Sequence, residues 1–386
     1  MIRAQTAVTT ELDDPKAAAE EILSQIDLSR LLKNNVGIIS FYQDMHETGV
    51  LEAVAKALPF DTVGCSVLSS GTEREFAFEQ LSVAVLSSDD VSFSTAVSAD
   101  VTPENAEDVT RDCYRDALSK LGGKPSLIFA FGPITYDISG DRYTLTLDAE
   151  SGGVPIFGTL SNTGIVYEDA RVMYNGVARS LALSLVLVSG DIKPRFYSMA
   201  ISDSNVTRKG SIVTDSDKYI LKKINDVTVA DYLKEIGVVT GEQGAIVSLP
   251  ILIDYKDGTK PTAYSMYGTT EQGMLVGGLI PVGSEIVFAD VDYDSVMSTA
   301  RDALDMILED LNNGGASFTL IIPCFSRCLT LGMQSEDEMK LTAQRLQGHR
   351  PYLFMYSGGE ICPVPDADGR LVNRFHNMTY TALILD

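Results

Sequence analysis

The sequence is poor in basic residues and histidine, and it contains no long apolar run. Its 30 lysine and arginine residues stand against 53 aspartate and glutamate residues, which gives a formal net charge of −23. A field of this sign repels phosphate backbones and anionic lipid heads. The composition therefore argues against nucleic acids and membrane surfaces as partners.

The longest apolar stretch, SLALSLVLVSG at 180–190, is too short to span a bilayer and predicts a buried strand. The first 21 residues hold no apolar segment typical of a signal peptide. The five cysteines are an odd number scattered along the chain, which is not typical of a disulfide framework. These features together predict a cytoplasmic protein.

A hydrophobic content of 45% over 386 residues supplies a core for each of two or three domains. Helix signals recur along the chain as a capping residue followed by an apolar stripe. They predict helices that start near Asp14-Pro15, Thr102-Pro103, Asp294 and Ser335. In the last of these, Ser335 and Glu338 have the spacing of a capping box.

Three segments follow one order, in which an apolar strand and an intervening stretch precede a short strand with small residues at its end and then a β-rich strand. They are VGIISFY to LSVAVLSS, SLIFAFG to SLALSLVLVSG, and FTLIIPCFS to TYTALILD. The intervening stretch predicts a helix in the first and third segments, whereas DRYTLTLDAE in the second alternates like a strand.

This order predicts an α/β protein with mixed β-sheets flanked by helices and with internal strand-helix-strand-strand repeats. The small-residue ends GCS, GTLSN and SGGE would occupy equivalent positions at strand ends, where open α/β sheets bind ligands. A division near residue 190 gives two domains, 1–190 and 191–386. The second contains YILKKINDVTVADYLKEIG, a strand that runs into a helix, and strand signals in GAIVSLPILIDY and SEIVFADVDY.

The region from 316 to the end resembles the C-terminal part of the FIST family of sensory domains. The likeness is carried by FSR at 325–327, Gly332, the acidic helix from Glu336, GGEICP, and HNMT at 376–379. Residues 1–190 are similar to the N-terminal part of that family, since VGIISFY, TVGCS and PIFGTLSNTG occur in its order. Cys328 and Thr159 depart from the family pattern at positions where glycine is expected.

The resemblance implies a cytoplasmic sensory module that binds a small ligand, with amino acids among the proposed ligands. Some relatives are similar to haem-binding gas sensors. Many relatives carry a fused signalling domain, whereas here the resemblance covers the chain, so we expect a signalling partner in trans.

Arg327 and Glu360 are the strongest candidates for ligand contact. Arginine can hold a carboxylate through two parallel hydrogen bonds and glutamate can hold an ammonium, so the pair could grip both ends of an amino acid. The alternative is that the two side chains pair with each other as a structural ion pair.

His376 and Asn377 precede a predicted strand, and both could contact a ligand, although His376 could equally be a buried core residue and Asn377 could stabilise a turn. The complete set of predicted ligand-binding residues is Ser326, Arg327, Tyr356, Gly358, Gly359, Glu360, His376, Asn377, Cys65 and Asn162.

Two other classes of function stay open. Cys324, Cys328, Cys362 and His376 could suggest zinc, and Cys362 or a histidine could ligate haem, but the chain has only three histidines and we expect no cofactor. Cys65 follows a predicted strand as a nucleophile of a hydrolase or transferase would, with His46 near it in sequence, yet no Gly-x-Ser-x-Gly elbow is present.

Overall fold

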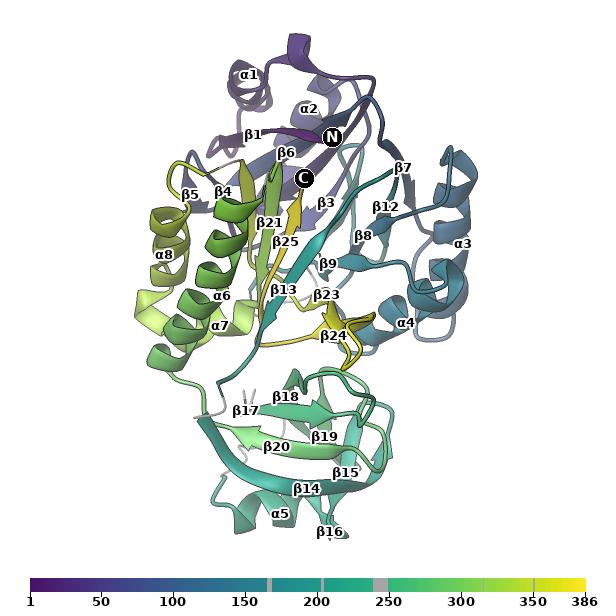
Figure 1. Ribbon diagram of the computed structural model, residues 1–386, viewed down its shortest axis with the longest axis vertical. Helices are drawn as coiled ribbons and strands as arrows, with labels where there is room; N and C mark the ends of the chain where they lie inside the picture. The colour runs from purple at the N-terminus through teal and green to yellow at the C-terminus, as the bar shows by residue number, and fades with distance from the viewer. Residues whose placement is uncertain (165–168, 203–204, 239–248, 315, 350) are drawn as a thin grey trace.

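The computed structural model describes residues 1–164, 169–202, 205–238, 249–314, 316–349 and 351–386 (Figure 1). In these residues the chain is an α/β protein with four β-sheets, of which three form a large body and the fourth forms a smaller module. Within the same residues no helix has the length and apolar character to cross a membrane.

The three sheets of the body have the same strand order, in which the third and fourth strands are parallel. Sheet one runs β1 (Arg3–Thr9), β6 (Leu81–Ser88), β2 (Asn34–Phe41), β3 (Thr62–Ser66), β10 (Val172–Tyr174) and β11 (Val177–Arg179). Sheet two runs β7 (Ser92–Val97), β12 (Ser184–Ser189), β8 (Leu127–Gly132), β9 (Ile156–Leu160), β23 (Glu360–Pro365) and β24 (Leu371–His376). Sheet three runs β13 (Arg195–Met199), β25 (Tyr380–Leu385), β21 (Phe318–Pro323), β22 (Tyr352–Met355), β4 (Ser69–Thr72) and β5 (Phe76–Phe78).

The last two strands of each sheet form a hairpin that comes from a distant part of the chain. The hairpin β23–β24 joins β9 in sheet two, and β4–β5 joins β22 in sheet three. Strands from both sides of residue 190 are therefore hydrogen-bonded within single sheets. The shared strand order is a property of backbone pairing, and the internal repeat of the sequence stays a prediction.

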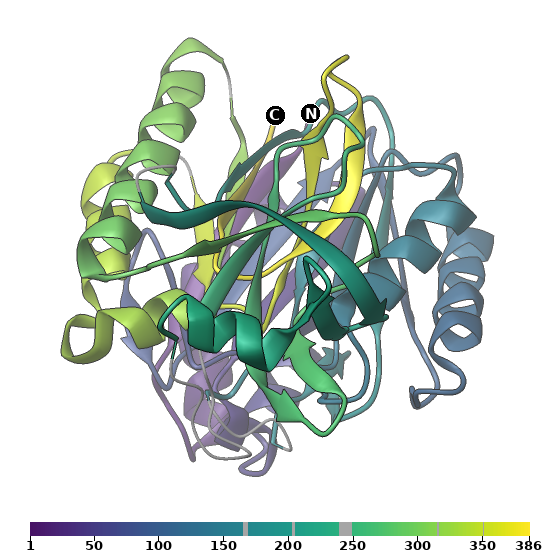
Figure 2. The same ribbon diagram turned by 90° about the horizontal axis from the view of Figure 1, so that it is seen from below.

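Helices cover the outer faces of the three sheets on three sides of the body, as the purple, blue and green helices of Figures 1 and 2 show. They are α1 (Pro15–Gln25) and α2 (Val50–Ala57) at sheet one, α3 (Ala106–Lys120) and α4 (Gly140–Ser151) at sheet two, and α6 (Tyr293–Asn313), α7 (Phe325–Leu331) and α8 (Asp337–Arg345) at sheet three. The inner faces share one core, to which Ile38, Phe129 and Leu320 each contribute from a different sheet. Burial of these apolar faces from water holds the three sheets together.

The fourth sheet lies below the body in Figure 1 and closes on itself, because β14 (Val206–Asp217), at one end of the strand order, pairs with β20 and also with β15 near the other end. The other strands are β20 (Glu285–Ala289), β17 (Leu249–Asp254), β18 (Thr262–Thr270), β19 (Gly273–Val276), β15 (Ile220–Ile224) and β16 (Val227–Thr228). Helix α5 (Val229–Glu235) packs against β15, β16 and β19. We call residues 206–289 the module.

Most helices and strands with strong local signals are where the sequence predicts them. Helices α1, α3, α6 and α8 match the four predicted helices, and Asp14 caps α1 by accepting hydrogen bonds from two backbone N–H groups. Helix α3 begins at Ala106, later than expected. The predicted strand and helix at 219–237 are β15 and α5, and of GAIVSLPILIDY the residues before 249 lie outside the described residues.

Two local predictions are wrong. DRYTLTLDAE is helix α4 and not a strand, because Tyr143 and Leu147 face the core one turn apart while Leu145 between them is 44% exposed. The capping box of Ser335 and Glu338 does not form, since α8 is capped by Glu336 without a side-chain hydrogen bond. The Glu338 carboxylate instead accepts hydrogen bonds from Arg327.

Candidate functional site

The small-residue ends of β3 and β9 and the turn after β22 meet through backbone hydrogen bonds. The Asn162 N–H donates to the Ser66 carbonyl at 2.8 Å. The Gly358 N–H donates to the Leu160 carbonyl at 3.0 Å, and the Leu160 N–H donates to the Gly359 carbonyl at 3.0 Å. The segments GCS, GTLSN and SGGE are thus brought together from three distant parts of the sequence.

Gly358 and Gly359 allow this close approach. A Cβ at Gly358 would lie 2.5 Å from the Ser161 carbonyl oxygen. Gly359 has φ +149°, and a Cβ there would lie 2.4 Å from Cζ of Phe375. Both positions require glycine for steric reasons, so the turn is tightly packed against its neighbours.

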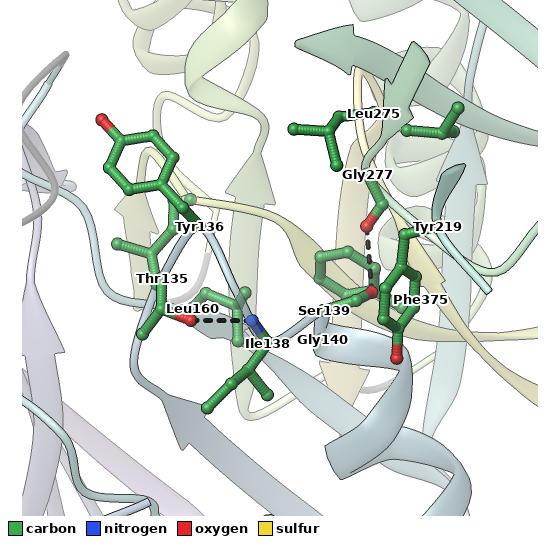
Figure 3. A pocket seen from close by; sticks show the side chains of 13 residues that line it. Thr135, Tyr136, Ile138, Ser139, Gly140, Leu160, Tyr219, Leu275, Gly277 and Phe375 are labelled. Atoms are coloured by element: carbon green, nitrogen blue, oxygen red, sulfur yellow. Dashed lines mark hydrogen bonds between the residues drawn. The ribbon is translucent and has the colours of Figure 1, made fainter. Parts of the chain in front are cut away.

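A cleft lies beside this turn, between the body and the module (Figure 3). Its volume is about 80 Å³. A single water needs about 10–15 Å³ by this measure, so the cleft has room for a small ligand of several non-hydrogen atoms. The lining residues are Ile134, Thr135, Tyr136, Ile138, Ser139, Gly140, Leu160, Tyr219, Leu275, Val276, Gly277, Gly358 and Phe375.

The cleft wall is mainly apolar, with hydroxyl groups on the segment that enters α4. The Ser139 hydroxyl donates to the Gly277 carbonyl at 3.0 Å and so connects the body with the module. The Thr135 hydroxyl accepts from the Ile138 N–H at 3.0 Å. A few placed polar groups in an apolar wall are typical of small-molecule sites.

Asp141, in the first turn of α4, links the same two parts. Its Oδ2 accepts from the Leu279 N–H at 2.6 Å and from the Tyr264 hydroxyl at 3.1 Å. The Tyr255 hydroxyl in turn donates to Tyr264 at 3.0 Å. Burial raises the pKa of Asp141 to about 6, while the hydrogen bonds from Leu279 and Tyr264 oppose the shift. The Asp141 carboxylate therefore connects helix α4 of the body with the module next to the cleft.

Glu360 is fully buried next to the glycine turn and does not line the cleft. It accepts hydrogen bonds from the Ser357 hydroxyl, and from the Thr379 hydroxyl at 2.5 Å and N–H at 3.3 Å. Burial raises its pKa to about 7 against the opposing effect of these hydrogen bonds. Its contacts connect the turn to the residues before β25.

Arg327 is a buried side chain of α7 with a complete set of partners. Its Nε and Nη2 donate to Oε1 of Glu338 at 2.9 and 2.6 Å. Nη2 also donates to the Val296 carbonyl at 2.8 Å, and Nη1 donates to the Thr299 hydroxyl at 3.1 Å. Arg327 thus pairs with Glu338 of α8 and not with Glu360, and it does not line the cleft.

Tyr356 and Ser326 belong to the surroundings of this ion pair. The Tyr356 hydroxyl donates to Oε2 of Glu338 at 2.9 Å. Ser326 lies in α7, where its carbonyl accepts from the Thr330 hydroxyl at 2.9 Å. Neither of them lines the cleft.

His376 and Asn377 end β24 and begin the turn to β25. His376 is buried, its Nε2 lies 2.9 Å from the Cys362 carbonyl oxygen, and burial lowers its pKa to about 4. The Asn377 N–H donates to the Ala263 carbonyl of the module at 2.9 Å. His376 is therefore a neutral core histidine, and Asn377 takes part in holding the module to the body.

Cys65 and Asn162 lie at the converging strand ends. Cys65 is in the central core, where burial raises the pKa of its thiol. His46 lies on the 3-10 helix Gln43–His46, with Nδ1 2.5 Å from the Gln43 carbonyl oxygen. Asn162 accepts from the Gly164 N–H at 2.8 Å through its Oδ1. A neutral buried thiol lacks the activation that a cysteine nucleophile requires.

Metal ligation was an alternative for Cys324, Cys328, Cys362 and His376. The part of the chain that the structure describes contains no group of three His, Cys, Asp or Glu side chains that could hold a metal ion. Burial raises the pKa of both Cys324 and Cys328, whereas metal ligation requires the thiolate.

Of the predicted set, only Gly358 lines the cleft. The other lining residues, which were not predicted from the sequence, are in the segments 134–140 and 275–277 together with Leu160, Tyr219 and Phe375. Two features of the sequence could have indicated some of these residues. Ser139 is a helix-capping residue, which was overlooked because a strand was predicted there, and Phe375 directly precedes HNMT.

Comparison with known proteins identifies the family. A model described as FIST N domain matches residues 35–227, and one described as FIST C domain matches residues 229–363. No curated protein matches the chain. A solved structure titled "Crystal structure of cyanuic acid hydrolase from A. caulinodans" is similar with 10% identity and a TM-score of 0.38, over 100% of this chain and 99% of that chain. The two domain matches confirm the resemblance seen in the sequence, and the chain belongs to the FIST family.

Proposed function

We propose that this protein is a sensory protein that binds a small ligand in the cleft between the body and the module. FIST domains are generally sensory domains that bind small ligands. The proposal rests on the observation that residues of both matched domains line the cleft. Ser139 and Tyr219 lie in the FIST N match, whereas Gly277 and Gly358 lie in the FIST C match. A ligand in the cleft would therefore contact both domains at once.

The ligand that we propose is an amino acid or a similar small polar metabolite. The size of the cleft and its mixture of apolar wall and hydroxyl groups support a molecule of this kind. Arg327 and Glu360 would then act indirectly. Glu360 anchors the turn that carries Gly358 by accepting from the Ser357 hydroxyl, and Arg327 anchors α7 and α8.

We propose that the signal is a change in how the module sits on the body. The hydrogen bond from Ser139 to Gly277 crosses the cleft and joins the two parts. A ligand that binds one arrangement better than another shifts the population toward it. A separate partner protein would read this shift, in a cytoplasmic setting that agrees with five free cysteines and a strong acidic charge.

A thermal-shift screen over amino acids and small metabolites tests the proposal, because a ligand at 100 times its Kd adds about 2.7 kcal/mol of stability. Leu275→Trp should fill the cleft and abolish the shift. Val282→Trp is the matched control, since Val282 is a 60% exposed residue of the same module that does not line the cleft. No shift with any compound, or a shift that survives Leu275→Trp, would contradict ligand binding at this site.

A further inference from the structure

A second hollow adjoins the cleft on the other side of Tyr219. It is a groove of about 330 Å³ between α3, α4 and the turn from β14 to β15. Its lining residues are Glu107, Arg111, Arg142, Leu145, Thr146, Ala149, Glu150, Lys218, Tyr219 and Leu279. Tyr219 lines both hollows, so the groove and the cleft are neighbours that share this side chain.

The charges of the groove leave one cation without a partner. Arg142 is paired with Glu107, its Nε donating to Oε1 at 2.7 Å, and Arg111 donates to Glu150 at 2.8 Å. Lys218 is exposed and makes no ion pair with any residue that the structure describes. Of the charged side chains that line the groove, three are positive and two are negative, and the Lys218 charge also acts on the Glu107 carboxylate.

Tyr219 adds a hydrogen-bond donor at the boundary between the two hollows. Figure 3 shows its ring reaching down from the module, with the hydroxyl directed away from Leu275 and Gly277. Within the described residues this hydroxyl has no hydrogen-bond partner. Burial raises its pKa, the Asp141 and Glu107 carboxylates raise it further and Arg142 lowers it, so the hydroxyl stays protonated. Tyr219 and Lys218 both line the groove, and a neutral phenol and an ammonium are both hydrogen-bond donors suited to an anion.

The backbone at Lys218 is a second and independent observation. Asp217 pairs with Ile220, so Lys218 and Tyr219 form a two-residue turn, in which Lys218 has φ +53°. Two-residue hairpin turns favour glycine, asparagine or aspartate at positions of positive φ, and lysine is unfavourable there. Residues held in such conformations occur preferentially at functional sites.

Contacts with the cleft wall hold the turn in place. The Lys218 carbonyl accepts from the Ile280 N–H at 2.9 Å, and the Tyr219 carbonyl accepts from the Val276 N–H at 2.8 Å. Val276 itself lines the cleft. These hydrogen bonds therefore fix the backbone of the turn relative to the apolar cleft.

We propose that the ligand is a small carboxylate with an apolar body, which lies in the cleft while its carboxylate binds Lys218 and the Tyr219 hydroxyl. This inference rests on the proposed function and specifies the chemical class of its ligand. It assigns recognition of the negative charge to the turn at 218–219 and no role in recognition to an amino group.

The test compares three probes of similar shape by calorimetry: 4-methylpentanoate, its neutral amide 4-methylpentanamide, and the cation 3-methylbutylamine. We expect the acid to bind at least about tenfold more tightly than the amide or the amine. Added salt should weaken binding of the acid alone, since the ammonium of Lys218 is exposed to solvent.

Two variants assign the effect to Lys218. Lys218→Gly removes the ammonium and gives the turn a residue suited to its φ, so the variant should fold at least as well as the parent while its affinity for the acid falls to that for the amide. Lys256→Gly is the matched control, because Lys256 also has positive φ at +59° in the module but does not line either hollow. It should leave affinity for the acid unchanged.

The inference is overturned if the acid fails to bind at about 10 mM, if the amide binds equally well, or if Lys218→Gly leaves acid binding unchanged. If the amide or the amine binds as tightly as the acid and Leu275→Trp abolishes this binding, the inference is overturned and the proposed function stays intact. Failure of every compound in the metabolite screen would contradict both.

Discussion

Replacing Arg327 distinguishes a structural role from direct ligand contact. In Arg327→Met the guanidinium is lost and the Glu338 carboxylate, 0% exposed, keeps only the hydrogen bond from Tyr356. An uncompensated buried charge costs about 3–5 kcal/mol. The Thr299 hydroxyl also loses its contact with Arg327, whereas it keeps the helical carbonyl of Ser295. We therefore expect a loss of about 3–5 kcal/mol in the free energy of unfolding.

The double variant Arg327→Met/Glu338→Leu provides the sharper test. It leaves no unpaired charge in the interior, and apolar replacement of a whole buried pair is often neutral or stabilising. The Tyr356 hydroxyl then lacks its acceptor, so recovery should be incomplete. We expect the double variant to be more stable than Arg327→Met even though it carries one more substitution.

Urea unfolding followed by circular dichroism measures these differences, and the melting temperature of Arg327→Met should fall by on the order of 5–10 °C. Lys340→Met is the control, because the side chains of the ion pair between Lys340 and Glu336 are 68% and 54% exposed, and solvent screening leaves such a pair with little effect on stability. If Arg327→Met unfolds like the parent and loses only ligand binding, the side chain is a ligand contact and the structural reasoning is wrong.

Three further predictions concern buried residues of the body. The pKa of Glu360 is about 7 in the folded protein and 4.5 as a free side chain, so stability should fall by about 3 kcal/mol as pH rises from 4.5 to 7, and Glu360→Gln should remove this component of a pH-resolved unfolding series. Equal slopes for parent and variant would refute that assignment. Gly359→Ala should cost at least about 1 kcal/mol and weaken ligand binding in the thermal-shift assay, because its Cβ would press on the Phe375 ring that lines the cleft. Cys65 should resist a thiol-labelling reagent in the native protein, since all five thiols are buried, and rapid labelling before unfolding would reopen a catalytic role for it.

Local signals in the sequence were sufficient for elements whose ends are set by their own residues. Asp14 caps α1 with its own side chain. In α6 the apolar residues recur at helical spacing, and this local pattern is sufficient to predict the helix and its buried face. The strand predicted at α4 was wrong. Tyr143, Leu145 and Leu147 are apolar at every second position, so the sequence fits the period of a strand as well as that of a helix, although Leu145 is exposed. The predicted capping box at Glu338 was also wrong. Ser335 is the partner that local spacing suggests, whereas Glu338 pairs with Arg327 of helix α7.

The site was predictable only in part for a related reason. The resemblance of the three small-residue ends was visible in the sequence, and their hydrogen bonds to one another follow from the position of each at a strand end. The cleft, however, is formed where the module packs on the body, and its wall joins the segments 134–140 and 275–277 with Tyr219 and Phe375. Packing between parts so distant in sequence leaves no periodic pattern.

The same contacts that form the cleft also hold the module in place, and in the proposed function they would connect ligand binding with signalling. Ser139 and Gly277 line the cleft and are hydrogen-bonded to each other, while Asp141 next in the same helix turn accepts from Leu279. A ligand that displaces or strengthens these hydrogen bonds changes the free energy of module docking by the difference between the two arrangements. By reciprocity, whatever binds the module and alters its docking changes ligand affinity by the same factor. Under the proposed function, a partner protein that contacts the module would therefore be able to read the state of the cleft.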